Sequence, residues 1–76
     1  MSSLLPGRYR HFKGNDYELL YIVFHSETLE EYVVYRALYG EQAIWVRPRS
    51  MWGDLVEHNS ESVPRFRYVG EMRTDP

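Results

Sequence analysis

The chain contains no cysteine, and this absence excludes several kinds of fold and site. Neither a disulfide framework nor a thiolate-bound metal can form without thiols. Small extracellular domains usually depend on such cross-links, so their absence favours the reducing environment of the cytosol. The sequence therefore predicts a cytoplasmic protein that has no metal site.

Long hydrophobic runs are also missing. The longest apolar run, Leu19–Phe24, is far shorter than the ~20 residues that a membrane-spanning helix requires. The first residues, Met1–Pro6, lack the basic region and the apolar stretch of a secretory signal. We expect neither a membrane partner nor a secreted protein.

The chain has no large excess of one charge, with 9 Lys and Arg against 11 Asp and Glu and a formal net charge of -2. Overall charge therefore does not recruit nucleic acid or an anionic membrane. The two signs nevertheless alternate in blocks along the sequence. Such blocks can neutralise each other on the folded surface, or folding can collect the basic blocks into a positive patch.

Aromatic residues are abundant, at 16% of a chain of 76 residues that is 43% hydrophobic. This length predicts a single domain, residues 1–76, with a core over residues 7–69 and loose termini at 1–6 and 70–76. A domain of this size buries only about 60% of its unfolded surface. We expect its stability to be small and to depend on aromatic rings, each of which removes ~150–250 Å² from water.

Apolar patterns bounded by Gly, Pro, Asn and Ser predict five strands. They lie at Arg8–Phe12, Tyr17–His25, residues 29–38, Ala43–Arg47 and Val63–Val69. Five short strands joined by turns favour an all-β fold, a small barrel or roll. The strand that contains Leu19–Phe24 is apolar on both faces, so its second face needs a cover from this chain or from a second molecule.

Residues 29–38 also fit a helix, because Thr28 and Glu31 resemble a capping box. The β-branched and aromatic segment Tyr32–Tyr35 favours the strand. After Pro48 the segment Arg49–Leu55 predicts one short helical turn, and Glu57–Ser62 predicts a polar loop.

Two large side chains in the predicted helical turn have two possible roles. Met51 and Trp52 can close one end of the barrel, or they can form an exposed anchor for a partner.

Five segments resemble those of an uncharacterised bacterial family, domain of unknown function 1653. They are Gly7–Gly14, His25–Glu30, Val34–Gly40, Trp45–Pro48 and Pro64–Tyr68, in the order that the family has them. The resemblance implies an SH3-like barrel over nearly all of residues 7–69. It implies no activity, cofactor or site residue, because the family has none assigned.

Arginine interleaved with aromatic residues is the constellation that favours a binding function. The candidate ligand-binding residues are Arg8, Arg10, Arg36, Tyr39, Trp45, Arg47, Arg65 and Arg67. If they share a face, we expect a non-catalytic module that binds a protein or peptide. The alternative is single-stranded RNA or DNA, since guanidinium groups bind phosphate and rings stack on bases. Equally, the arginines can pair with the acids of the chain itself and cover its rings.

The residue types of catalysis are present but not in a productive arrangement. His25, Ser26 and Glu27 are adjacent in the sequence, and adjacent side chains on a strand point to opposite faces, so they cannot form a relay. The glycines are dispersed at turns and form no phosphate-binding loop. We expect no catalytic residue, no enzyme activity and no cofactor, and we expect His11 and His25 to bond the backbone of turns.

Overall fold

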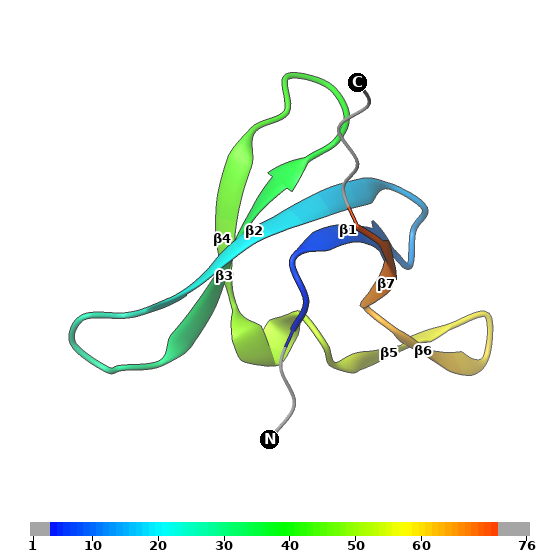
Figure 1. Cartoon of the computed structure of the whole chain (residues 1–76). Helices are drawn as coiled ribbons and strands as arrows, with labels where there is room; N and C mark the ends of the chain where they lie inside the picture. The colour runs from blue at the N-terminus through cyan, green and yellow to red at the C-terminus, as the bar shows by residue number, and fades with distance from the viewer. Residues whose placement is uncertain (1–3, 72–76) are drawn as a thin grey trace.

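The computed structural model describes residues 4–71, which form an all-β, SH3-like barrel (Figure 1). Its elements are β1 Gly7–His11, β2 Asp16–Phe24, β3 Glu31–Ala37, β4 Ile44–Pro48, the 3₁₀ turn η1 Arg49–Met51, β5 Leu55–His58, β6 Glu61–Pro64 and β7 Phe66–Gly70. No helical segment among them has the length and apolar character needed to cross a membrane.

Five strands form one antiparallel sheet in the order β4-β3-β2-β1-β7, and β5 and β6 form a separate hairpin. The sheet has β4 at one edge and β7 at the other. Turn η1 and the β5–β6 hairpin carry the chain from the first edge to the second (Figure 1). The β5–β6 hairpin therefore lies beside β7, the strand that directly follows it in the chain.

The approach of β1 to β7 depends on a glycine. Gly7 has a φ of 141°, and a Cβ atom added there would lie 2.6 Å from the carbonyl oxygen of Gly70. A larger residue would force the two strands apart. A register shift between Arg8 and Tyr9 follows at once in the same pair of strands, and such shifts increase the local twist that bends a sheet.

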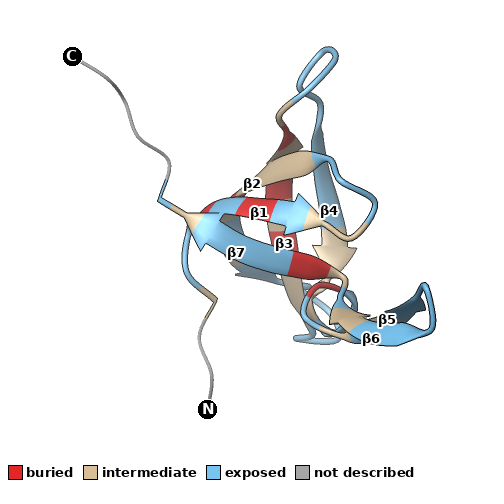
Figure 2. Cartoon of the chain, turned by 90° about the vertical axis from the view of Figure 1, so that its right-hand side faces the viewer, coloured by how far each residue is buried: buried red, intermediate tan, exposed pale blue. Residues whose placement is uncertain are grey.

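The core is a cluster of aromatic rings around Trp52, which is fully buried. Its ring stacks on Phe66 with 3.8 Å between centroids and meets Tyr35 and Tyr9 edge-on at 5.0 and 5.3 Å. Leu19 and Val33 belong to the same buried cluster, and Figure 2 marks the buried segments along the strands. Trp52 is therefore part of the closed core, the first of its two expected roles, and is not an exposed anchor. Met51 beside it is 45% exposed.

The predicted strands of the sheet are confirmed, including the ambiguous segment 29–38. It forms β3, in which Val33, Tyr35 and Ala37 are buried and alternate with partly exposed residues. The helical alternative is wrong, because the strand pattern places these side chains on one face of the sheet. The helical turn predicted after Pro48 is confirmed as η1, although it spans only three residues.

Two predictions for the C-terminal third are wrong. Glu57–Ser62 is not a loop but the centre of the β5–β6 hairpin, whose turn residues Asn59 and Ser60 have φ values of 54° and 65°. Two consecutive positive φ angles are typical of the turns that join hairpin strands. The predicted strand Val63–Val69 is two strands, because the backbone amide of Arg65 turns to donate to the Asp54 carbonyl oxygen.

The expected loose termini are ordered in part. Leu4 packs against the core, and the Tyr9 hydroxyl donates to the Leu5 carbonyl oxygen at 2.7 Å. At the other end Gly70 belongs to β7. The remainder of that expectation concerns residues 1–3 and 72–76, which lie outside the described residues.

Substitutions of Trp52 test how far stability depends on the ring cluster. We expect Trp52→Ala to lose ~3–5 kcal/mol of unfolding free energy, a large part of the roughly 4–11 kcal/mol available to a domain of this length. Trp52→Phe retains the stack on Phe66 and removes an indole N–H that has no hydrogen-bond partner. Its loss should therefore be only ~1–2 kcal/mol.

Urea denaturation followed by circular dichroism measures both changes. The control is Met51→Ala, which changes a neighbouring exposed side chain and should stay within ~0.5 kcal/mol of the original chain. Equal losses at positions 51 and 52 would contradict the central role of the Trp52 ring.

Candidate functional site

The sheet distributes the eight candidate residues over different surfaces. We call the side of the sheet away from Trp52 the outer face. Strand register places Arg10 opposite Arg67, Arg8 opposite Glu18, and Glu18 opposite Arg36. Directly opposed residues share a face, and this face lies away from buried Tyr9 and Tyr35. Four of the candidates, Arg8, Arg10, Arg36 and Arg67, are therefore neighbours on the outer face.

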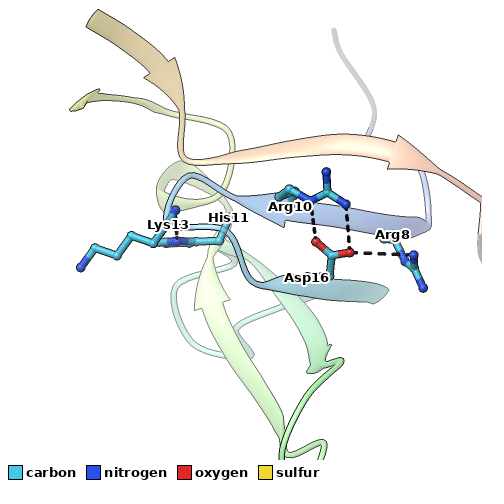
Figure 3. A network of polar contacts seen from close by, with 5 residues as sticks. All are labelled: Arg8, Arg10, His11, Lys13 and Asp16. Atoms are coloured by element: carbon cyan, nitrogen blue, oxygen red, sulfur yellow. Dashed lines mark hydrogen bonds and ion pairs between the residues drawn. The ribbon is translucent and has the colours of Figure 1, made fainter. Parts of the chain in front are cut away.

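Two acids partly neutralise these arginines. Arg10 donates from Nε to Oδ1 of Asp16 at 2.8 Å, and Arg8 lies 3.8 Å from the same carboxylate (Figure 3). The hydrogen bond from Arg10 lowers the pKa of Asp16. Arg36 approaches Glu18 at 3.5 Å. Within residues 4–71, no acid lies at ion-pair distance from Arg67, which is exposed.

Three other candidates lie beside the aromatic core on the opposite side of the sheet. The Arg47 guanidinium lies 6.0 Å from the ring centroid of Tyr35 and donates to the Met51 carbonyl oxygen at 3.3 Å. The Tyr39 and Tyr17 hydroxyls are 2.7 Å apart. Burial, more than this hydrogen bond, raises the pKa of Tyr17 to about 12.

Trp45 completes this second group and is its most exposed ring. It pairs with Tyr35 across β4 and β3 but leaves 57% of its surface exposed. The group formed by Tyr39, Trp45 and Arg47 is thus separate from the four outer arginines. The single Arg/aromatic face expected from the sequence does not form.

Arg65 is occupied by a structural contact. It donates from Nε and Nη2 to the two carboxylate oxygens of Asp54, both at 2.9 Å. These bonds lower the pKa of Asp54 and fix the link between β6 and β7 to the segment after η1. The structure gives Arg65 the intramolecular role that was the alternative to binding.

The histidines also bond the backbone, as expected. Nδ1 of His11 accepts from the Lys13 amide at 3.2 Å, and Nδ1 of His25 accepts from the Glu27 amide at 3.1 Å. Burial lowers the pKa of His11, with further contributions from Arg47 and neighbouring cations. Within residues 4–71, no group of three His, Cys, Asp or Glu side chains could hold a metal ion.

An apolar patch on the outer face is the main feature that the candidate list missed. Register aligns Tyr21, Val34 and Val46 in one row across β2, β3 and β4. Tyr21 is 67% and Val46 60% exposed, and Val23 and Ile44 beside them are also exposed. The second apolar side of Leu19–Phe24 is therefore uncovered by residues 4–71. The doubly apolar pattern of this strand was the signal that could have located the patch.

Strand β4 adds unpaired backbone to this patch. The Ala37 amide donates to the Ala43 carbonyl oxygen, and the pairing alternates along an antiparallel ladder. Trp45 and Arg47 therefore bond β3, while the amides and carbonyls of Ile44 and Val46 point away from it. No strand among residues 4–71 pairs with that side of β4.

Acid titration tests the Asp54–Arg65 contact. Because the folded state lowers the pKa of Asp54, the carboxylate stabilises the fold above its unfolded pKa of ~3.9 and loses this effect as pH falls through the folded value. Asp54→Asn should cost ~0.5–1 kcal/mol at neutral pH and almost nothing at pH ~2. Urea midpoints across this range measure the difference. The exposed Glu57→Gln is the control, and a constant Asp54→Asn deficit at all pH values would contradict the linkage.

The comparisons agree with the resemblance seen in the sequence. The family described as a protein of unknown function (DUF1653) matches residues 7–68. The crystal structure of a DUF1653 protein from Bordetella bronchiseptica is similar, with a TM-score of 0.83, 35% sequence identity and coverage of 96% of each chain. No protein with a curated description matches. The chain belongs to the DUF1653 family.

Proposed function

We propose that the chain is a small, non-catalytic binding module of the bacterial cytoplasm that holds an extended peptide segment of a partner protein. The segment adds to β4 as a sixth strand of the sheet. The observation that carries the proposal is the unpaired outward side of β4, flanked on both faces by exposed apolar side chains.

Backbone geometry supplies the affinity of such a complex. The outward amides and carbonyls of Ile44 and Val46 are spaced as a strand requires, and an added antiparallel strand would bond all four groups. Pro48 has no amide to offer, so the docking edge ends there. Main-chain bonding of this kind tolerates many peptide sequences.

Side chains supply the selectivity, because the two faces of β4 differ. Ile44 and Val46 lie on the outer face beside Tyr21, and they favour apolar residues at alternate positions of the peptide. Trp45 and Arg47 lie on the other face. They favour an aromatic or acidic residue at the intervening positions.

An exposed apolar edge strand can pair with other chains and promote aggregation. A binding role explains why β4 has such an edge. Natural edge strands are commonly protected by lysine, inward charges or bulges. The central residues Ile44, Trp45 and Val46 carry no charge and are all more than half exposed. An apolar edge of this kind is typical of a surface that meets another chain.

Single-stranded RNA or DNA is the second candidate ligand, and the outer arginines are the observation that favours it. Within residues 4–71, Arg8 and Arg10 share Asp16, Arg36 lies beside Glu18, and Arg67 has no acid at ion-pair distance. Binding through phosphates would weaken steeply with rising salt. Labelled oligonucleotides that fail to bind even at low salt would exclude this candidate.

Hydrogen exchange and an edge variant test the peptide proposal. In the free protein we expect the amides of Ile44 and Val46 to exchange quickly and those of Trp45 and Arg47 slowly. Peptides selected from a random display library should protect the first pair. Val46→Pro removes an outward amide, and it should weaken these peptides by about tenfold or more.

The matched control is Val46→Thr, which retains the amide and the β-branched shape. It should bind the selected peptides within about threefold of the original chain. Equal binding by the proline and threonine variants would show that the peptides use another surface. So would exchange rates at Ile44 and Val46 that peptide leaves unchanged.

A further inference from the structure

A cleft at the opposite edge of the sheet has the features of a second, small-molecule site. It lies between the end of β1, strand β7 and the β5–β6 hairpin, and its volume is ≈ 260 Å³. Its lining includes Arg10, Phe12, His58, Val63, Pro64 and Arg67, and no acidic residue among residues 4–71 contributes to it. The cleft is remote in the sheet order from β4, so it is independent of the peptide edge.

Two arginines at this cleft oppose each other without a shared counter-charge. Arg10 and Arg67 are directly paired across β1 and β7, and like charges at such positions destabilise a sheet. Asp16 on β2 accepts a hydrogen bond from Arg10 (Figure 3). No acid among residues 4–71 lies within ion-pair distance of Arg67. An anion held between the two guanidinium groups would remove this repulsion.

Aromatic and apolar groups form the rest of the cleft. The Phe12 ring lies tilted against the His11 ring, with 4.5 Å between centroids, and meets the His58 ring edge-on at 5.4 Å. Lys13 Nζ lies 5.8 Å from the centroid of Phe12 and adds a third cation nearby. Val63 and Pro64 line the side of the hairpin. The cleft therefore places aromatic rings next to two arginines, Arg10 and Arg67, that lie opposite each other.

We propose that this cleft binds a planar ring that carries a phosphate, a ligand with the chemistry of a nucleoside monophosphate. Arg67 holds the phosphate in bidentate geometry, and Arg10, whose Nε and Nη2 already donate to Asp16, adds its remaining N–H groups. Phe12 and His58 contact the ring, since every nucleobase has a π-face that aromatic side chains accept.

The dimensions restrict the ligand to about the size of a single nucleotide. A cavity of ≈ 260 Å³ lies just below the ~300–1,000 Å³ of ordinary small-molecule sites. A polymer would have to extend across the exposed outer face instead. The hairpin also has a clear role, because His58, Val63 and Pro64 reach the cleft only through the β5–β6 pairing.

Titration with adenosine 5′-monophosphate, adenosine and inorganic phosphate, followed by NMR of backbone amides, tests the proposal. The nucleotide should shift the amides of Phe12, Gly14, His58 and Arg67, with a Kd on the order of 0.1–1 mM. Adenosine and phosphate alone should each bind at least about tenfold more weakly. Phosphate binding as tightly as the nucleotide would overturn the role of the rings.

Arg67→Gln should weaken the nucleotide by about tenfold or more. Arg36→Gln is the control, because Arg36 lies on the same outer face beside Glu18 but does not line the cleft. It should retain binding within about twofold. Equal losses in the two variants would indicate attraction by overall charge and would overturn the site, as would the absence of any amide shift at millimolar nucleotide.

Two further readouts separate binding from folding. His58→Leu keeps an exposed hairpin side chain but removes its ring, and it should weaken the nucleotide by about fivefold. Without ligand, Arg67→Gln should raise Tm by about 1–3 °C because it removes the repulsion with Arg10. A lower Tm would show that Arg67 stabilises the free protein, and it would overturn the argument that an anion between the two arginines relieves a repulsion.

Discussion

The stack of Trp52 on Phe66 is the contact on which the rest of the fold depends. Trp52 follows the 3₁₀ turn and Phe66 begins β7, so their contact ties together the segments that leave one edge of the sheet and arrive at the other. Tyr9 and Tyr35 meet the same indole from β1 and β3. A small domain has little aliphatic core, and here one aromatic side chain joins three strands that are distant in sequence.

Within residues 4–71, this construction leaves two sheet edges with different surfaces. The aromatic core lies on the inner side of the sheet. On the outer side of β2, β3 and β4, Tyr21 and Val46 remain exposed. At β7 the neighbouring hairpin adds a wall beside paired arginines. The charges divide in the same way: Arg65 is fixed by Asp54, whereas Arg67 faces another cation. An arginine held in a structural ion pair thus lies two residues from the arginine to which we assign a ligand.

The sequence was informative where one physical pattern dominated. Alternation in β1 and the continuous apolar run of β2 located these strands, and the β-branched residues of β3 correctly outweighed a capping box. The β5–β6 hairpin was not predicted because its central segment, Glu57–Ser62, is polar throughout and its turn has Asn59-Ser60 in place of a glycine. Local propensity contains no signal for such a hairpin, which forms through backbone pairing.

The candidate site could be predicted residue by residue but not as a surface. Which arginines share a face depends on register, and the shift after Leu19 and the shift after Arg8 cannot be counted from periodicity alone. Ion pairing depends on the same register, because it brings Asp16 to Arg10 and Glu18 to Arg36. The eight residues could therefore be chosen from the sequence. The fold places four of them on the outer face, three on the other side of the sheet, and Arg65 in a structural contact with Asp54.

The contrasting positions of the two tryptophans give the protein built-in optical probes. Trp52 is enclosed by rings, whereas Trp45 stands in solvent at the free edge of β4. Their indole emission therefore differs in colour, with the buried ring emitting at shorter wavelength. Loss of structure changes the first signal, and a peptide added to β4, as we propose, would change the second. Folding and binding can thus be followed in the same sample without any attached label.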